Sequence, residues 1–190
     1  AHFPGSKIVI PSDAYTAKGL LKSAIRDNNP VIVVEHRKHY SVEFDMPDDG
    51  DENLLLPIGK SVVVHEGSDV TVVANSFQVG QCVKVAKHLE RKKGVSVEVI
   101  DLRTLVPLDK ETIIKSVKKT GRLLIVDEGY TSFGVAAEIC AAIQDEVFYD
   151  LDAPIQRLCA PDVSIPFSPA LEKLVVPNEN TILAAVEKLL

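Results

Sequence analysis

The turn from Arg26 to Pro30 gathers Asp27, Asn28 and Asn29 within a single bend of the chain. It follows a predicted helix, and the end of a helix presents carbonyl oxygens that lack intrahelical donors and carry partial negative charge. Carboxylate, amide and carbonyl oxygens are ligands that hard monovalent or divalent cations accept. The same residues are also the commonest turn formers. From spacing alone we therefore favour an ordinary turn, with a cation site as the alternative.

The histidines and cysteines are weaker candidates for chemistry. His36 and His39 follow an apolar run and could act as acid or base in a cleft, but a solvated or capping role is favoured. Cys82, Cys140 and Cys159 are odd in number, lie far apart and show no Cys-x-x-Cys spacing. This pattern argues against a disulfide framework and against a zinc site. We expect three reduced thiols that pack as small apolar groups.

Polar residues also follow several apolar runs. Asn75 and Ser76 lie where open α/β sheets bind ligands, although capping of the next helix is the favoured role. Asp101 and Arg103 can face the same way and are expected to form a salt bridge that shapes a loop. Residues 127–134 suit a helix entry or a subunit contact. The sequence has no Gly-rich phosphate loop and no nucleophile elbow, which disfavours a self-contained nucleotide site.

The elements that position these residues follow from hydrophobic periodicity. Short β-branched runs beginning at Val31, Val70 and Leu123 are typical of strands buried on both faces of a parallel sheet. Alternation of such strands with helices predicts an α/β fold with a mostly parallel sheet. Amphipathic helices are predicted over residues 14–25, 79–89, 109–117, 133–143 and 178–190. Helix caps are expected at Gly94, at Asp109, and at Asn178 or Asn180.

The sequence divides into two predicted units. Residues 41–59 break both periodicities with acidic residues, Pro and Gly. We therefore expect a first unit over residues 1–42, a linker over 43–59 and a second unit over 60–190. The first unit is too short for a core of its own, so it is expected to be the end of a longer domain. The absence of an initiator Met and of signal or transit character fits a fragment or a processed product.

Composition excludes several classes of protein. With 46% hydrophobic and 25% charged residues, the sequence has the composition of a folded globular protein. Its net charge of −6, with scattered basic residues, disfavours nucleic acid and anionic membranes as partners. The longest apolar runs are strand-length and fall far short of the roughly 20 residues that a membrane span requires.

Five stretches together resemble one family. They are AHFPGSKIVIPSDAYTAKGLLKSAIRDNNPVIVVE, VEVIDLRTLVPLD, SVKKTGRLLIVDEGY, FGVAAEICAAI and LDAPIQRLCAPDVSIPFSPALE. They resemble the beta subunits of thiamine-diphosphate-dependent 2-oxo acid dehydrogenases, and those of the pyruvate dehydrogenases most. The resemblance implies the end of a transketolase-like pyrimidine-binding domain, followed by a transketolase C-terminal-like domain whose mostly parallel sheet is flanked by helices.

The resemblance also implies an activity and partners. The family enzyme is an α2β2 heterotetramer that binds thiamine diphosphate and Mg between an alpha and a beta subunit, decarboxylates its 2-oxo acid and reductively acylates a lipoyl group. Its catalytic glutamate and histidine precede the matched stretches, so no catalytic or cofactor-binding residue is assigned here. The expected partners are the alpha subunit, a second beta subunit and the subunit-binding domain of the dihydrolipoyl acyltransferase. The implied compartment is the cytoplasm in a bacterium and the mitochondrial matrix in a eukaryote.

Several alternatives remain open at this point. The protein could belong to a branched-chain 2-oxo acid dehydrogenase or an acetoin dehydrogenase, to a single-chain enzyme of the transketolase group, or to a non-catalytic docking module. A fragment without the upstream half is expected to bind thiamine diphosphate poorly and to lack activity.

Two sets of site residues are implied by the resemblance. An acid, Asp152, and the terminal carboxylate of Leu190 match the docking site for the acyltransferase, provided that Leu190 is the true C-terminus. The resemblance implies a potassium ion at the turn from Arg26 to Pro30, where it is held mostly by backbone oxygens. Its matching ligands are Ala24, Ile25, Asp27 and Asn29.

Overall fold

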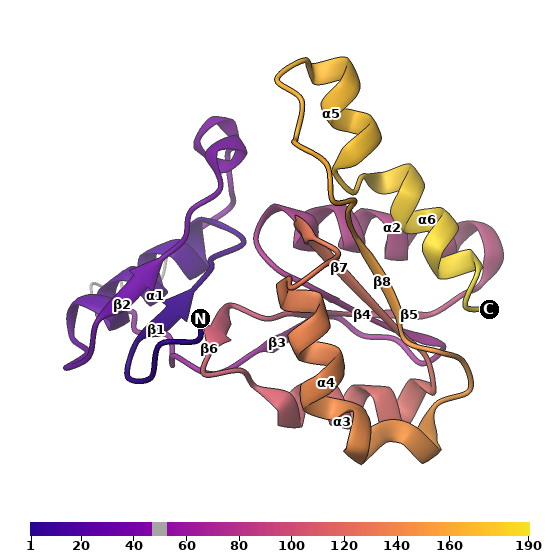
Figure 1. Ribbon diagram of the computed structural model, residues 1–190, viewed down its shortest axis with the longest axis horizontal. Helices are drawn as coiled ribbons and strands as arrows, with labels where there is room; N and C mark the ends of the chain where they lie inside the picture. Colours follow the sequence, from indigo (N-terminus) through magenta and orange to yellow (C-terminus); the bar gives the residue numbers. More distant parts are fainter. Residues whose placement is uncertain (47–52) are drawn as a thin grey trace.

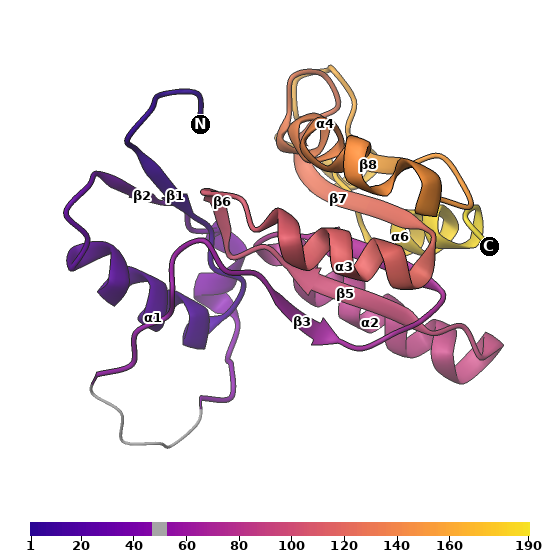
Figure 2. The same ribbon diagram turned by 90° about the horizontal axis from the view of Figure 1, so that it is seen from below.

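The computed structural model describes residues 1–46 and 53–190 of the protein. It contains a three-stranded sheet near the N-terminus and a five-stranded sheet formed by the rest of the sequence. The two sheets lie side by side, and the N-terminal part occupies one end of the molecule (Figures 1 and 2).

The small sheet has the order β2-β1-β6 and is completed by a strand from far along the sequence. β1 (Lys7–Val9) pairs in parallel with β2 (Val31–Val33) and antiparallel with β6 (Thr104–Val106). Helix α1 (Ala14–Ile25) connects β1 to β2, and a 3₁₀ turn, η1 (Arg37–Ser41), follows β2. The pairing of β1 with β6 joins the two parts of the molecule, and sequence periodicity gave no indication of it.

The large sheet has the order β3-β5-β4-β7-β8. Its neighbouring strands are parallel except at β3, which pairs antiparallel with β5. The prediction of a mostly parallel sheet is therefore confirmed. The strands are β3 (Val62–His65), β4 (Val70–Ala74), β5 (Val97–Asp101), β7 (Leu123–Tyr130) and β8 (Gln156–Ala160).

Helices cover both faces of the large sheet. α2 (Phe77–Lys93) and α6 (Glu179–Glu187) pack on one face, and α3 (Lys110–Thr120) and α4 (Val135–Val147) pack on the other. A 3₁₀ turn, η2 (Phe148–Asp150), follows α4, and the short helix α5 (Pro169–Val175) projects away from the sheet (Figure 1). Within the described residues, we find no helix whose length and apolar character would let it cross a bilayer.

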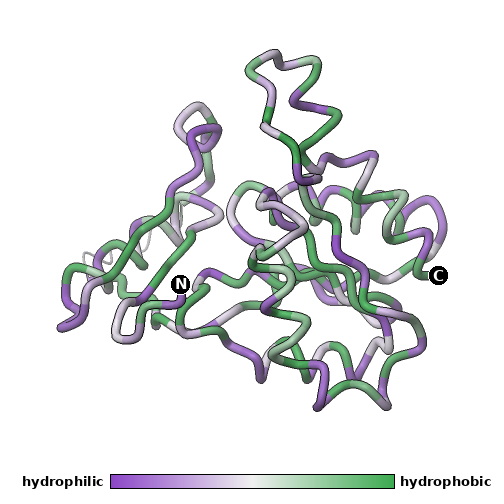
Figure 3. The backbone as a smooth tube through the Cα atoms, in the orientation of Figure 1, coloured by the Kyte–Doolittle hydropathy of each residue, from purple (hydrophilic) through white to green (hydrophobic). Residues whose placement is uncertain are grey.

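The core follows the alternation of side chains along the strands. Val72 and Leu124 face α2 and α6, whereas Val73 and Ile125 face α3 and α4, and all four are buried. Figure 3 shows hydrophobic segments running through these central strands. The prediction of burial on both faces is correct for β4 but wrong for β2, where Ile32 is 53% exposed because that strand lies at the edge of the small sheet.

The later part of the predicted linker packs on the N-terminal part. Leu54 and Leu56 are buried and form a small cluster with Val9 of β1 and Leu20 of α1. Residues 47–52, which belong to the same predicted linker, lie outside the described residues. The segment that leads from one part of the molecule to the other thus supplies apolar cover for α1.

The helix predictions are largely confirmed. α1 has the predicted bounds, and the other long helices differ from prediction by a few residues at each end. Gly94 caps α2 with a φ of 66°, Asp109 accepts the N–H of Thr112 at the start of α3, and Asn178 caps α6. Ser76 precedes α2 but makes no capping hydrogen bond, so its predicted role is wrong in that respect.

Two glycines offer a matched test of the packing. A Cβ at Gly67 would lie 2.2 Å from the backbone nitrogen of Glu98 and from the carbonyl carbon of Val97, whereas a Cβ at Gly80 in α2 meets nothing within 4 Å. We expect Gly67→Ala to lower the free energy of unfolding by about 2 kcal/mol or more, because the backbone of β5 must shift. Gly80→Ala should raise it by about 0.5–1 kcal/mol through helix propensity. Urea unfolding followed by circular dichroism measures both free energies of unfolding. Equal changes for the two substitutions would contradict the close packing of Gly67 against β5.

Candidate functional site

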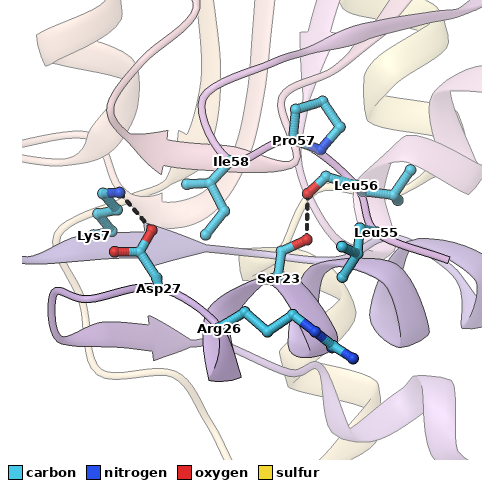
Figure 4. Close-up of a pocket in the computed structure, with 8 residues that line it drawn as sticks. All are labelled: Lys7, Ser23, Arg26, Asp27, Leu55, Leu56, Pro57 and Ile58. Atoms are coloured by element: carbon cyan, nitrogen blue, oxygen red, sulfur yellow. Dashed lines mark hydrogen bonds and ion pairs between the residues drawn. The ribbon is translucent and has the colours of Figure 1, made fainter. Parts of the chain in front are cut away.

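The turn between α1 and β2 is organised around the carboxylate of Asp27. Its Oδ1 accepts the backbone N–H of Asn29 at 2.9 Å and the Nδ2 group of the same asparagine at 3.0 Å. Its Oδ2 accepts a hydrogen bond from Nζ of Lys7 at 2.5 Å (Figure 4). The bond from Lys7, followed by those from Asn29, lowers the pKa of Asp27 to about 2. The carboxylate is therefore ionised at neutral pH and paired with an ammonium group.

A hollow of about 430 Å³ lies beside this turn. Ser23 of α1 donates a hydrogen bond from its Oγ to the carbonyl oxygen of Leu56 at 2.6 Å, which holds the returning segment against the helix. Figure 4 shows Lys7 and Asp27 on one side of the hollow and this Ser23–Leu56 bond on the other. Its lining residues are Lys7, Ser23, Arg26, Asp27, Leu55, Leu56, Pro57 and Ile58.

The predicted potassium ligands lie in one turn at and after the end of α1, where carbonyl groups carry partial negative charge. Both carboxylate oxygens of Asp27 accept hydrogen bonds, and two positive side chains, Lys7 and Arg26, line the hollow beside it. The carbonyl of Ala24 accepts hydrogen bonds from the N–H of Asp27, at 3.3 Å, and from the N–H of Arg26. Among residues 1–46 and 53–190, no cluster of three or more His, Cys, Asp or Glu side chains could hold a metal. A site of several carboxylates, as divalent cations prefer, is thus not formed by the described residues.

The two predicted docking residues lie at the opposite end of the molecule from this turn. The side chain of Asp152 is 65% exposed, and its Oδ2 lies 3.9 Å from Nη2 of Arg122. Leu190 is 51% exposed. Both views place the C-terminus and the segment that leads into β8 at the same end (Figures 1 and 2). The structure thus leaves both residues accessible on one end of the large sheet.

A polar cluster that was not predicted joins the two parts of the molecule at Glu128, near the end of β7. Its Oε2 lies 2.8 Å from Nε2 of His36, and its Oε1 accepts from Nε2 of Gln78 at 2.7 Å. The same Gln78 nitrogen donates to the carbonyl of Pro177 at 3.1 Å. Because Nδ1 of His36 accepts the backbone N–H of Lys38, Nε2 is the ring nitrogen that donates. His36 therefore caps η1, as predicted, and also binds the large sheet.

Aromatic and charged contacts surround this cluster. The ring of His36 stacks on Phe77 with centroids 5.1 Å apart, and Nζ of Lys38 lies 5.3 Å from the centre of the same ring. Lys38 also pairs with Glu172 of α5 at 3.0 Å. Burial, followed by the nearby charge of His36, lowers the pKa of His39. η1 thus binds the start of α2, with the ring of Phe77 at the centre of the contact.

A second junction forms where β5 ends. Ser12 donates to Oδ2 of Asp101 at 2.5 Å, and the backbone N–H of Arg103 donates to Oδ1 at 3.0 Å. The Nε of Arg103 lies 3.7 Å from the same carboxylate, which confirms the predicted salt bridge. Burial raises the pKa of Asp101 to about 6, against the opposing effects of Ser12 and Arg103.

At the carboxyl ends of β4 and β7, where capping was favoured over ligand binding, two protein side chains bind each other. Nδ2 of Asn75 donates to Oδ1 of Asp127 at 3.0 Å, and both residues are buried. Sequence reasoning placed Asn75 at a helix cap, but its side chain instead binds the neighbouring strand.

Asp101 generates a pH prediction with a definite sign. The folded-state pKa of Asp101, about 6, lies above its ordinary value. As the pH rises, the unfolded state therefore loses this proton at a lower pH than the folded state does. The stabilising effect of this carboxyl group is complete below about pH 4 and is lost as the pH rises to about 6. Relative to Asp101→Asn, the wild type should lose about 2 kcal/mol of unfolding free energy between pH 4 and pH 6.

Urea titrations at half-unit pH steps measure this difference, with Asp145→Asn on the exposed face of α4 as the control. If the unfolding free energy of the wild type does not fall relative to that of Asp101→Asn as the pH rises, the carboxyl group is not protonated preferentially in the folded state.

Comparison with known proteins identifies the family. Residues 59–182 match the transketolase C-terminal domain, and residues 1–43 match the transketolase pyrimidine-binding domain. The protein is 46% identical over 191 residues to the pyruvate dehydrogenase E1 component subunit beta of Bos taurus, covering 100% of this sequence and 53% of the relative. It is 43% identical over 191 residues to the 2-oxoisovalerate dehydrogenase subunit beta of Bacillus subtilis, covering 100% of this sequence and 57% of the relative. It spans about half the length of the curated relatives that it matches.

A solved structure supports the fold assignment. A split-gene transketolase described as an inactive beta4 tetramer superposes with a TM-score of 0.76 at 23% identity, covering 99% of this protein and 58% of that one. This likeness shows a shared fold and confirms the predicted α/β class. The protein therefore belongs to the transketolase C-terminal domain family, and its first residues match the transketolase pyrimidine-binding domain.

Proposed function

We propose that this protein is part of the beta subunit of a pyruvate dehydrogenase of the acetyl-transferring type, which decarboxylates pyruvate and reductively acylates a lipoyl group. The observation that carries this proposal is 43–46% identity along almost the whole sequence to proteins from an animal, a slime mould and a plant that are named pyruvate dehydrogenase subunit beta. These relatives are named as mitochondrial proteins, which supports a mitochondrial location.

The described residues contribute to assembly more than to chemistry. Thiamine diphosphate, when bound, would supply the nucleophile and the electron sink that decarboxylation of a 2-oxo acid requires. The diphosphate and its Mg need a phosphate-binding loop and several oxygen ligands, and the described residues include neither a Gly-rich loop nor a carboxylate cluster. A complete cofactor site thus does not fit these residues, and its contacts belong to other parts of the assembled enzyme.

Exposed apolar side chains support a subunit contact. Phe133, in the loop after β7, and Phe167, before α5, are fully exposed, and Leu174 of α5 is largely exposed. Large exposed apolar side chains are enriched on surfaces that bind partner subunits. The alpha subunit and a second beta subunit are the proposed partners for these surfaces.

The remaining site residues take roles within this proposal. Backbone oxygens of Ala24, Ile25, Asp27 and Asn29 would hold a potassium ion that braces the pyrimidine-binding domain. The carboxylates of Asp152 and Leu190 would bind the subunit-binding domain of the dihydrolipoyl acyltransferase, and the exposure of both residues supports this role.

A branched-chain 2-oxo acid dehydrogenase is the second candidate. The observation that favours it is the 43% identity to a 2-oxoisovalerate dehydrogenase subunit beta, close to the values for the pyruvate enzymes. A subunit of an acetoin dehydrogenase and a non-catalytic docking module are further candidate functions.

A substrate assay separates these candidates. The full-length beta subunit, purified with its alpha subunit, thiamine diphosphate and Mg, should turn over pyruvate with a kcat/KM at least about tenfold above that for branched-chain 2-oxo acids and acetoin. The control is the 190-residue protein alone, which should show no activity and no tight binding of thiamine diphosphate by calorimetry. Preference for a branched-chain acid or for acetoin would replace the pyruvate assignment, and tight binding of the cofactor by the 190 residues alone would refute the division of the site between subunits.

The docking role of Asp152 is tested by a binding measurement. Asp152→Asn in the assembled enzyme should weaken binding of the acyltransferase subunit-binding domain roughly tenfold, because a charged partner group then loses its counter-charge. Asp145→Asn, which removes another exposed carboxylate from α4, should leave the affinity unchanged. Surface plasmon resonance at two salt concentrations measures both, and equal affinities for wild type and Asp152→Asn would remove this residue from the contact.

A further inference from the structure

The large sheet has a topological switch point between β4 and β7. These two strands are adjacent and parallel. The helix that follows β4, α2, packs on one face of the sheet, whereas the helix that follows β7, α4, packs on the other. In open α/β sheets, ligands bind outside the carboxyl ends of two such strands. The side chains at this position therefore merit a separate examination from those of the turn after α1.

Three buried oxygen atoms at the switch point have no hydrogen-bond partner among the described residues. They are Oγ of Ser76, Oε1 of Gln78 and Oδ2 of Asp127, and their residues are only 5%, 1% and 6% exposed. Buried side-chain oxygens are almost always satisfied in folded proteins, and those without a protein partner commonly contact a bound water molecule or ion. Because all three atoms can accept a hydrogen bond or coordinate a metal ion, the position suits a donor group or a cation.

The protein holds these residues in place through their other polar atoms. Nδ2 of Asn75 donates to Oδ1 of Asp127 at 3.0 Å. Nε2 of Gln78 donates to Oε1 of Glu128 at 2.7 Å and to the carbonyl of Pro177 at 3.1 Å. These bonds fix the orientation of the Asp127 carboxylate and of the Gln78 amide. They also hold the start of α2 beside the end of β7, so the free oxygen of each group is presented in a defined direction.

The charge of this position is negative. Asp127 and Glu128 are carboxylates, and their partners Asn75 and Gln78 are neutral amides. His36, which also binds Glu128, uses Nδ1 as an acceptor and is therefore neutral as well. The N-terminus of α2 supplies only about half a positive charge. A buried carboxylate without a positive partner is costly, which favours a cation over a water molecule beside Asp127.

The same atoms favour a monovalent ion. Calcium and magnesium sites gather six or more oxygen ligands, with carboxylates or substrate phosphates that balance the double charge. Here one carboxylate oxygen is accompanied by an amide oxygen and a hydroxyl group. This set balances a single positive charge.

We propose that the switch point between β4 and β7 binds a small monovalent cation through Oδ2 of Asp127, Oε1 of Gln78 and Oγ of Ser76. The ion satisfies the three buried oxygens and holds the start of α2 against β7. Since Gln78 binds Glu128, and Glu128 binds His36, the ion also stabilises the contact with the N-terminal part of the molecule. This site goes beyond the function proposed above and does not depend on the turn after α1.

Thallium(I) tests the site directly, because it replaces monovalent cations and scatters X-rays anomalously. Crystals of the full-length beta subunit with its alpha subunit are soaked in thallium acetate, and choline acetate serves as the blank. We expect an anomalous peak in contact with Oδ2 of Asp127. A bound water molecule without an anomalous peak at this position would overturn the proposal, whether or not a peak occurs at the turn after α1.

Solution titrations of the same complex measure the affinity and the ion preference. The melting temperature is followed by circular dichroism in the chlorides of ammonium, potassium, sodium and choline at constant ionic strength. The ion that gives the largest rise over choline distinguishes ammonium from an alkali ion as the ligand. Asp127→Asn should raise the half-saturating concentration of that ion at least about tenfold, because the charged ligand is lost.

Gly129→Ala provides a second variant that keeps all three oxygen atoms. A Cβ at this position would lie 2.7 Å from Oδ2 of Asp127, so the carboxylate must shift and ion binding should weaken. Asp145→Asn, on the exposed face of α4, should leave the titration unchanged. Titrations of Asp127→Asn and Gly129→Ala that both match the wild type would overturn the site. The anomalous map of the wild type decides the question if either variant folds poorly.

Discussion

The antiparallel pairing of β1 with β6 is the contact on which the arrangement of the molecule depends. β6 belongs to a segment that leaves the large sheet at the end of β5, and it supplies the third strand of the small sheet. The N–H of Ile10 also donates to the carbonyl of Arg103, and Ser12 donates to Asp101. A strand of three residues such as β1 is not stable alone, so the small sheet depends on pairing with β6 for its stability. The position of β1 in turn sets that of Lys7, which pairs with Asp27 in the turn after α1.

The contacts between the two parts of the molecule include a strand pairing, rings stacked on Phe77 and two polar junctions. Asp101 and Glu128 each bind a residue from the N-terminal part, whereas the apolar core of the large sheet is closed by its own helices. Polar junctions of this kind resemble contacts between domains more than the inside of one domain. The buried carboxyl group of Asp101 requires accurate partners, because a buried polar group without a hydrogen-bond partner is destabilising. Its hydrogen bonds with Ser12 and Arg103 therefore constrain how the two parts of the molecule meet.

Sequence reasoning found the elements whose signals are local. α1 could be predicted because its periodicity, its capping residue Asp13 and the turn after Arg26 all lie within one short segment. β6 could not, since three residues give no periodicity and their pairing partner lies almost a hundred residues earlier. The pair His36–Glu128 joins residues 92 positions apart, and the pair Lys7–Asp27 joins residues 20 apart. Nothing in the sequence around these residues indicates their distant partners. These contacts can therefore be identified only once the topology is known.

Two interpretations of the turn after α1 are possible, and the structure describes one of them directly. Asp27 and Asn29 act as turn formers, because the carboxylate accepts the amide hydrogens that fold the bend. The ammonium group of Lys7, which belongs to a different strand, pairs with the same carboxylate. A pattern of turn residues does not by itself argue against a cation site, because such a site can use backbone oxygens whatever side chains the turn carries. The side chains of this turn therefore specify the bend, and the ion pair with Lys7 fixes the bend against β1.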